Sequence, residues 1–352
     1  MVKSRIFLLA ALCSVANTHA ENISDADSAA VSSSVVDKHV MQQPQEDKLL
    51  FNHLSVSVTT GTTGVGLEVA MPVTKWAQLR TGFNYMPRFN HTMHFGVQLG
   101  DQQESAEAQQ TKFEKLSGML KSFMGTEVDS QIDMIGEPSF DNFKLMADIF
   151  PFKNKKWHLT VGFYYGGATV AKAWNAEEDM TSLVAMSMYN SMYERVRRSY
   201  ESQVEAMNDP FAVPVPYMTL GGVDYYADVT LYNNMMYFGR MGVHIADHEN
   251  GTPYRLEPDE NNMVKVEVKT NKFRPYIGFG YGGALSKKDD TYSLYFDCGL
   301  MFWGGTPKII THDGTNLSDL NNVRGKVGDY VKFIKAFPVF PVLNVRLTRK
   351  IF

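Results

Sequence analysis

The sequence predicts an all-β protein that crosses a membrane as a closed barrel of eight antiparallel strands, with long connections that contain helices. Three observations predict this fold. Segments of about ten residues alternate apolar and polar side chains, as in a strand with one face in lipid and one in a lumen. An N-terminal segment typical of exported proteins precedes them. No stretch provides the roughly 18 unbroken apolar residues of a membrane helix.

The N-terminus carries the pattern of a cleavable signal peptide over residues 1–20. Lys3 and Arg5 give it a positive start, a short apolar run follows, and small residues stand at the cleavage position. Residues 21–52 are polar, and we expect a flexible periplasmic leader there. Removal of the signal peptide leaves Cys298 as the single cysteine, which excludes an internal disulfide framework and a multi-cysteine metal site.

The barrel is predicted to occupy residues 53–352, with eight segments of alternating character. These segments are residues 54–60, 64–71, 76–86, 142–150, 157–167, 273–285, 291–303 and 338–352. The clearest is "TYSLYFDCGLMFW", in which every second residue from Tyr292 to Phe302 is apolar or cysteine. In "RPYIGFGYGG" the inward positions after Tyr276 are glycines, as a narrow lumen requires.

A soluble antiparallel sandwich also alternates in this way. The export segment, the uniformly apolar outward faces and the aromatic residues at strand ends favour the membrane. We expect Trp157, Tyr292 and Trp303 to lie in the interfacial girdles. A barrel of ten strands is the alternative, in which a hairpin within residues 244–270 supplies an additional pair.

The lengths of the connections predict the sidedness of the barrel. With the N-terminus in the periplasm, the first, third, fifth and seventh connections are external, and external connections are the long ones. Apart from a tight first turn, they are residues 87–141, 168–272 and 304–337. The connections "PVTK", "PFKNKK" and "SKKDD" are short and fall on the periplasmic side.

With these strands the chain resembles the small outer-membrane β-barrels of Gram-negative bacteria, the OmpA-like transmembrane type. The segments that carry the resemblance are "RPYIGFGYGG", "YFDCGLMFWGGTPK" and the terminal "VLNVRLTRKIF". The resemblance implies residence in the outer membrane and recognition of the terminal aromatic Phe352 by the barrel-assembly machinery. One departure is that Phe352 shares its phase with the polar Lys350. A bulge near Arg349, or use of Ile351 in its place, reconciles the two.

The inward face of the predicted barrel carries eight charged residues. They are Glu68, Arg80, Lys144, Asp148, Arg274, Asp297, Arg346 and Lys350. The interior of an eight-stranded barrel is just wide enough for side chains to fill, and buried charges are costly unless paired. We therefore expect ion pairs that plug the lumen, among them Glu68 with Arg80 and Asp297 with Arg346. A gated or slow pore is the alternative.

The long connections contain three amphipathic segments, which we expect to form helices. They span residues 104–124, 177–207 and about 317–336. The second places Val184, Met188, Met192, Val196, Tyr200 and Val204 at every fourth position. These helices either cap the mouth of the barrel or face a partner. Between the second and third, residues 244–270 are predicted to form a hairpin that turns at "EPDENN".

The sequence predicts a structural or surface-recognition role rather than catalysis. Ligand or partner binding is expected in the long connections. Lipid, lipopolysaccharide and an extracellular protein or glycan are the expected partners. A net charge of −4 with no basic stripe argues against nucleic acid.

The alternatives are a porin-like transport barrel and, third, a barrel enzyme that modifies lipid A. Neither a catalytic triad nor a cofactor site can be assembled from the sequence. The histidines in "NHTMH" and "HIADHE" have a spacing that metal ligands also show, but solvated loop histidines are far commoner, and we assign neither catalytic nor metal residues.

Overall fold

The computed structural model describes residues 53–100, 104–125, 127–323, 328–329, 332 and 338–351. The predicted signal peptide (1–20) and leader (21–52) lie outside the described residues, and so does Phe352.

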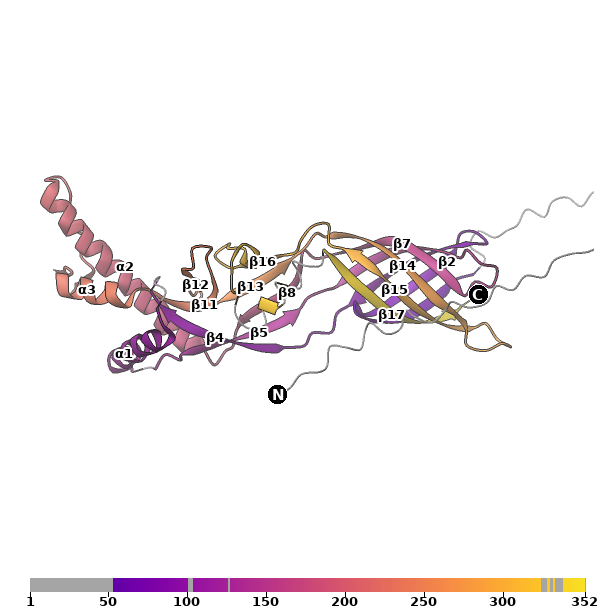
Figure 1. Cartoon of the computed structure of the whole chain (residues 1–352), viewed down its shortest axis with the longest axis horizontal. Helices are drawn as coiled ribbons and strands as arrows, with labels where there is room; N and C mark the ends of the chain where they lie inside the picture. The colour runs from indigo at the N-terminus through magenta and orange to yellow at the C-terminus, as the bar shows by residue number, and fades with distance from the viewer. Residues whose placement is uncertain are drawn as a thin grey trace, which may run out of the picture. The chain divides into compact units, whose positions relative to one another are not determined.

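Eight antiparallel strands close into a barrel in the order β1-β17-β15-β14-β7-β6-β3-β2 (Figure 1). Their bounds are β1 Ser55–Gly61, β2 Gly64–Pro72, β3 Ala77–Tyr85, β6 Asn142–Ile149, β7 Trp157–Gly166, β14 Phe273–Ala284, β15 Tyr292–Phe302 and β17 Val339–Lys350. The first and last strands pair from Ser55↔Lys350 to Gly61↔Asn344, which completes the closure. The prediction of eight strands is confirmed, with every end within two residues, and the ten-stranded alternative is wrong.

Side chains alternate between the two faces of the barrel wall. Every second residue of β14 from Arg274 to Gly280 is buried, and the residues between them are exposed. The exposed positions are large and apolar on every strand, including Leu67, Phe83, Leu159, Ile277, Phe296 and Leu347. The buried positions at mid-strand are mostly polar, charged or glycine. The pleat of the strands therefore sorts apolar groups outward and polar groups inward.

Three long connections leave the barrel from one end, because consecutive antiparallel strands alternate in direction. They follow β3, β7 and β15, and the connections after β2, β6 and β14 at the other end are short.

The three long connections jointly build a second sheet of seven strands, in the order β12-β11-β4-β5-β8-β13-β16. The strands are β4 His91–Leu99, β5 Gln131–Pro138, β8 Thr169–Asn175, β11 Met241–Asp247, β12 Pro253–Leu256, β13 Lys265–Lys269 and β16 Lys308–Thr311. A separate two-stranded sheet pairs β9 Met218–Leu220 with β10 Val223–Tyr225. The sequence had predicted helices and one hairpin in these connections, and the sheet is new.

The predicted hairpin with its turn at "EPDENN" is wrong. The strand β11 pairs instead with β12, across a turn at residues 248–252. The strand β13, which carries the alternating valines, pairs with β8 and β16. The alternation was real, but it marked a strand whose neighbours come from other parts of the chain.

Helices α1 Ala106–Met124 and α2 Met180–Asn208 confirm two of the predicted helices. A shorter helix, α3 Val229–Phe238, and the single turn η1 Leu317–Asp319 also lie in the long connections. Ten of the twenty residues of the predicted helix over about 317–336 lie outside the described residues, and the described residues 320–323 are not helical. No helix in the described part of the chain is both long and apolar enough to cross a bilayer.

The predicted apolar face of α2 is wrong at both ends. Val184, Met188 and Val204 are exposed, and the buried residues include Leu183 and Met186 instead. Residues four apart are rotated by about 40° around a helix. A stripe at every fourth position therefore turns by about 200° over 20 residues and cannot stay on one face.

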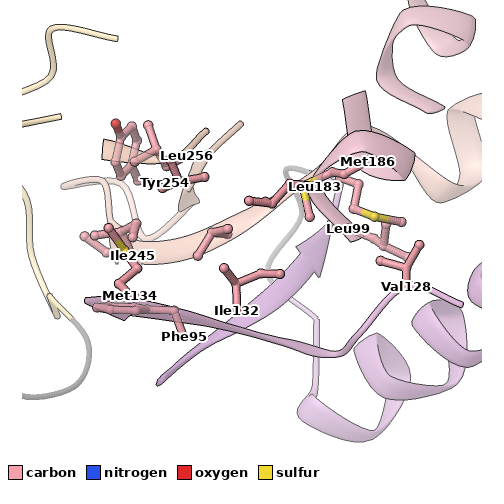
Figure 2. Close-up of a cluster of buried hydrophobic side chains, with 14 of the residues drawn as sticks. Phe95, Leu99, Val128, Ile132, Met134, Leu183, Met186, Ile245, Tyr254 and Leu256 are labelled. Carbon is pink, nitrogen blue, oxygen red and sulfur yellow. The ribbon is translucent and has the colours of Figure 1, made fainter. Parts of the chain in front are cut away.

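A hydrophobic core joins the helices to the seven-stranded sheet. Figure 2 shows Leu99 from the sheet close to Leu183 and Met186 from α2, with Ile132 and Phe95 of the same core farther along the sheet. From α1 this core receives Phe113 and Leu116. The long connections therefore form a folded unit with a core of their own, which we call the insertion domain.

Candidate functional site: the interior of the barrel

The centre of the barrel interior is occupied by charged side chains in mutual contact. Arg80 on β3 donates through Nη1 to Glu68 Oε2 on β2 at 2.9 Å and through Nη2 to Asp148 Oδ1 on β6, also at 2.9 Å. The Lys144 ammonium forms an ion pair with Glu68. All four residues are at most 5% exposed.

A second group lies on β7, β15 and β17. Arg346 Nε lies 3.2 Å from Asp297 Oδ2, and His158 Nε2 lies 2.8 Å from Asp297 Oδ1. Two longer ion pairs join this group to the first: Arg80 Nη1 lies 3.6 Å from Asp297 Oδ2, and Arg346 Nη2 lies 3.8 Å from Asp148 Oδ2. The two groups form one network, which we call the central ion network.

The central ion network balances three cations against three carboxylates, with His158 in addition. Burying a charge is costly unless a partner and hydrogen bonds offset the lost hydration. Here each carboxylate contacts at least two donors, so the cost is offset within the network.

Six of the eight predicted lumen residues belong to the central ion network, and both pairs named from the sequence form in the structure. The other two residues lie elsewhere. Arg274 is fully buried, but its hydrogen-bond partners among the described residues are all neutral, namely Asn142, Gly167 and Thr270. Lys350 is partly exposed at the end of the barrel with short connections, where its Nζ lies 3.1 Å from Asp290 Oδ2.

His158 was not among the charged inward residues named from the sequence. Strand phase alone does not show which inward residues meet across a lumen, because that depends on barrel stagger.

A buried aromatic cluster lies at the end of the barrel with the long connections. Phe140, Trp303 and Phe340 contact one another with ring centroids 5.4–5.7 Å apart. Arg274 lies over two of these rings, 5.0 Å from Phe140 and 6.0 Å from Trp303. Tyr164, Tyr276, Met301 and Val342 belong to the same cluster.

The predicted girdle position of Trp303 is wrong, because only 9% of this residue is exposed. The period of two explains the error. The side chains of Phe302 and of the even-numbered residues before it in β15 point outward, so the side chain of the next residue, Trp303, points inward. Trp157 and Tyr292 are exposed at their strand ends.

Glycine at position 280 makes room for the central ion network. A Cβ atom there would lie 2.3 Å from His158 Cε1 and 2.4 Å from Asp297 Oδ1. One of the glycines predicted to suit a narrow lumen therefore has a specific role. Because Gly280 has no side chain, His158 and Asp297 can contact each other beside it.

The histidines in the long connections do not assemble a metal centre in the described part of the chain, where no group of three or more potential ligands gathers. His91 and His94 lie three apart on β4, and residues three apart on a strand point to opposite faces. His94 Nδ1 lies 2.5 Å from Asp133 Oδ1, and His244 Nε2 lies 2.9 Å from Asp247 Oδ1.

A scan against protein-family models finds no match, and a search of curated proteins finds none. Among solved structures, CarO2 and CarO of Acinetobacter baumannii share 13% and 12% identity, with TM-scores of 0.34 and 0.33. The matches cover 85% of this chain and 98% of CarO2, and 84% of this chain and 97% of CarO.

A major outer membrane protein of Thermus thermophilus shares 9% identity over 85% of this chain and 98% of its own, with a TM-score of 0.26. Similarities this low say nothing about function, and the OmpA-like assignment stays a prediction. The barrel fold rests on the strand topology itself.

Proposed function

We propose that this chain is an outer-membrane β-barrel with a closed lumen, which anchors the insertion domain at the cell surface for a structural or recognition role. The observation that carries the proposal is the apolar outer wall. Leu67, Phe83, Leu159, Ile277 and Phe296 are each 53–63% exposed, on five different strands. A monomeric soluble protein rarely exposes apolar patches larger than a few hundred Å². A wall of this kind is suited to contact with the hydrocarbon chains of a lipid bilayer.

A bilayer also requires that the backbone N–H and C=O groups of a spanning segment form hydrogen bonds within the protein, and a closed barrel meets this requirement. Each strand pairs with a neighbour on both sides, so the sheet has no free edge. Arg349 and Tyr292, in contact at 5.8 Å, lie at one end of the wall, where an interfacial zone accepts both side chains.

The closed lumen is supported by two independent features. The central ion network fills the middle of the barrel, and the aromatic cluster fills the end that bears the insertion domain. An open pore would instead expose unpaired charges to a water-filled channel, as porins do. The proposal therefore favours an anchor over a transport barrel.

Recognition is assigned to the insertion domain because the described parts of the three long connections fold together around one core. Loops that only close a barrel need no such core. Lipopolysaccharide and an extracellular protein or glycan remain the proposed partners, and the barrel-assembly machinery is the proposed reader of the terminal segment.

Trypsin treatment of intact cells, followed by mass spectrometry, tests location and sidedness together. Lys115 and Lys121 are exposed on α1 of the insertion domain, and Lys287 and Lys288 are exposed in the turn at the opposite end of the barrel. We expect cleavage at Lys115 and Lys121 in intact cells, and cleavage at Lys287 and Lys288 only after lysis. Heat-modifiable electrophoresis of the same samples reports whether the barrel is folded. Recovery of the chain in the soluble fraction, or cleavage at Lys287 in intact cells, contradicts the proposal.

A further inference from the structure

The end of α2 and the segment after it expose large apolar side chains. Met207 is 83% exposed, Phe211 91% and Val213 79%. The segment folds back along the helix, since the Val215 amide donates to Ser202 Oγ at 2.8 Å. We call Phe211 and Val213 the apolar tip. Met207 is not part of it, because it follows Arg198 by nine residues and so lies about 180° around α2 from that residue. Exposed apolar groups gathered in this way mark an interaction surface.

The charge around the apolar tip restricts what can cover it. Residues 199–239 contain five acidic residues and no lysine, arginine or histidine. A surface of anionic lipid would be repelled by this segment. A partner must therefore combine apolar contact with basic side chains.

The same helix carries the complementary charge. Arg198 and Glu205 are seven residues apart, so they lie about two turns apart on one face of α2. Both are exposed, and neither side chain has a polar partner in the part of the chain that the structure describes. Arg197 differs, because its guanidinium lies 2.8 Å from Glu194 and 3.2 Å from Glu201.

A cavity of about 390 Å³ lies beside this face of α2, toward the start of the helix. Its lining includes Ser187, Ser191, Arg195 and Arg198, with Arg240 across from them. Arg240 is occupied by ion pairs to Glu194 and Glu257, whereas Arg195 has no side-chain partner among the described residues. The groove therefore offers two unpaired guanidinium groups.

We propose that two copies of this chain pair through α2, antiparallel, about a two-fold axis that passes between Glu201 and Ser202. The axis places Arg198 of each copy opposite Glu205 of the other and forms two equivalent ion pairs. Residues beyond Glu205 in one copy are then level with residues before Arg198 in its partner. The apolar tip of each copy is seated at the groove of the other, where the Phe211 ring can stack on the Arg195 guanidinium.

The arrangement is closed, since the same patch serves both copies and leaves no tip or groove unfilled. It needs only the insertion domain and is independent of the proposed location in the outer membrane.

Charge reversal tests the pairing in the full chain purified in detergent. Light scattering coupled to size-exclusion chromatography, corrected for bound detergent, gives the protein mass. We expect a dimer for the wild type, a monomer for Arg198→Glu and for Glu205→Arg, and a restored dimer for the double variant. Both residues are exposed and unpaired, so each single variant should keep the same heat-modifiable shift on electrophoresis. A monomeric wild type, or a dimer that survives Arg198→Glu, overturns the proposal.

Disulfide trapping tests the register separately. In a Cys13→Ser, Cys298→Ser background, Arg198→Cys with Glu205→Cys should give a covalent dimer under mild oxidation. The two positions cannot link within one copy, because they are about 10 Å apart along the helix and a disulfide needs Cα atoms within about 7 Å. Each single cysteine variant is the matched control, since its own copies would lie about 10 Å apart across the axis. Equal linking by a single variant, or no linking by the double variant, contradicts the register.

Discussion

Removal of one charge from the central ion network, by Asp297→Asn, should destabilise the barrel strongly. Asp297 contacts Arg346 at 3.2 Å, His158 at 2.8 Å and Arg80 at 3.6 Å, and the asparagine keeps the shape but not the charge. The network then holds three cations and two carboxylates. The nearest remaining carboxylate to Arg346 is Asp148 at 3.8 Å, which Arg80 already uses.

The expected loss is about 3–5 kcal/mol of unfolding free energy, the range for a buried ion pair that loses one partner. Coulomb's law gives a similar figure, about 5 kcal/mol for unit charges 3.2 Å apart at an effective dielectric constant of 20. Urea unfolding in lipid vesicles, followed by tryptophan fluorescence and by heat-modifiable electrophoresis, measures the change.

The matched control is Asp290→Asn, which removes a carboxylate 3.1 Å from Lys350 that is 76% exposed. An exposed pair of this kind contributes about 0–1 kcal/mol. The double variant Asp297→Asn, Arg346→Met should lose less than the sum of its single variants, because it removes the stranded cation. Equal effects of Asp297→Asn and Asp290→Asn would refute the account of the network.

Three further changes test other parts of the structure. Phe296→Arg puts a cation on the outer wall near the middle of β15 and should cost about 2–4 kcal/mol in the bilayer, whereas Phe296→Ala should still insert. Equal recovery of both variants in the membrane fraction argues against a lipid-facing wall. Gly280→Ala should destabilise the barrel by about 1–3 kcal/mol because its Cβ overlaps His158 and Asp297, whereas Gly118→Ala in α1 has open space and should stabilise its helix by about 0.5–1 kcal/mol; the same sign for both in urea unfolding would be inconsistent with the geometry. The pKa of Glu194 is lowered by hydrogen bonds from Arg197 and from Arg240, so the stabilisation by its carboxylate is complete above the ordinary glutamate pKa and is lost as the pH falls through the lowered value. The melting temperature of the insertion domain should therefore fall less between pH 7 and pH 3 in Glu194→Gln than in the wild type. Identical pH profiles of the two proteins would speak against this ion pair.

The barrel could be predicted from the sequence because its information is local. In β15, Leu300 and Phe302 face outward, whereas Gly299 and Met301 face inward. This period of two identifies the strand and both of its faces. The glycines of β14 gave the narrow interior in the same way. Where the period was applied fully, as at Asp297, the predicted direction agrees with the structure, and where it was not, as at Trp303, the prediction failed.

The insertion domain could not be predicted because its pairings are non-local. Val266 pairs with Ala173 on one side and Thr311 on the other, so its strand joins segments that are far apart in the sequence. In β11 all seven residues are buried, which removes the alternation that marks a strand. The full central ion network was hidden for a related reason: Asp148 and Arg346 lie on strands that are not neighbours in the wall, and only the closed barrel brings them within 3.8 Å.

Single-channel recording in planar bilayers tests the central claim most directly. The purified full chain, shown to be folded by heat-modifiable migration and inserted by flotation with the lipid, is the sample. A lumen filled by the central ion network and the aromatic cluster predicts a baseline without stable openings across the applied voltage. A uniform, long-lived conductance step from the wild-type chain would contradict a closed barrel and support a transport role instead.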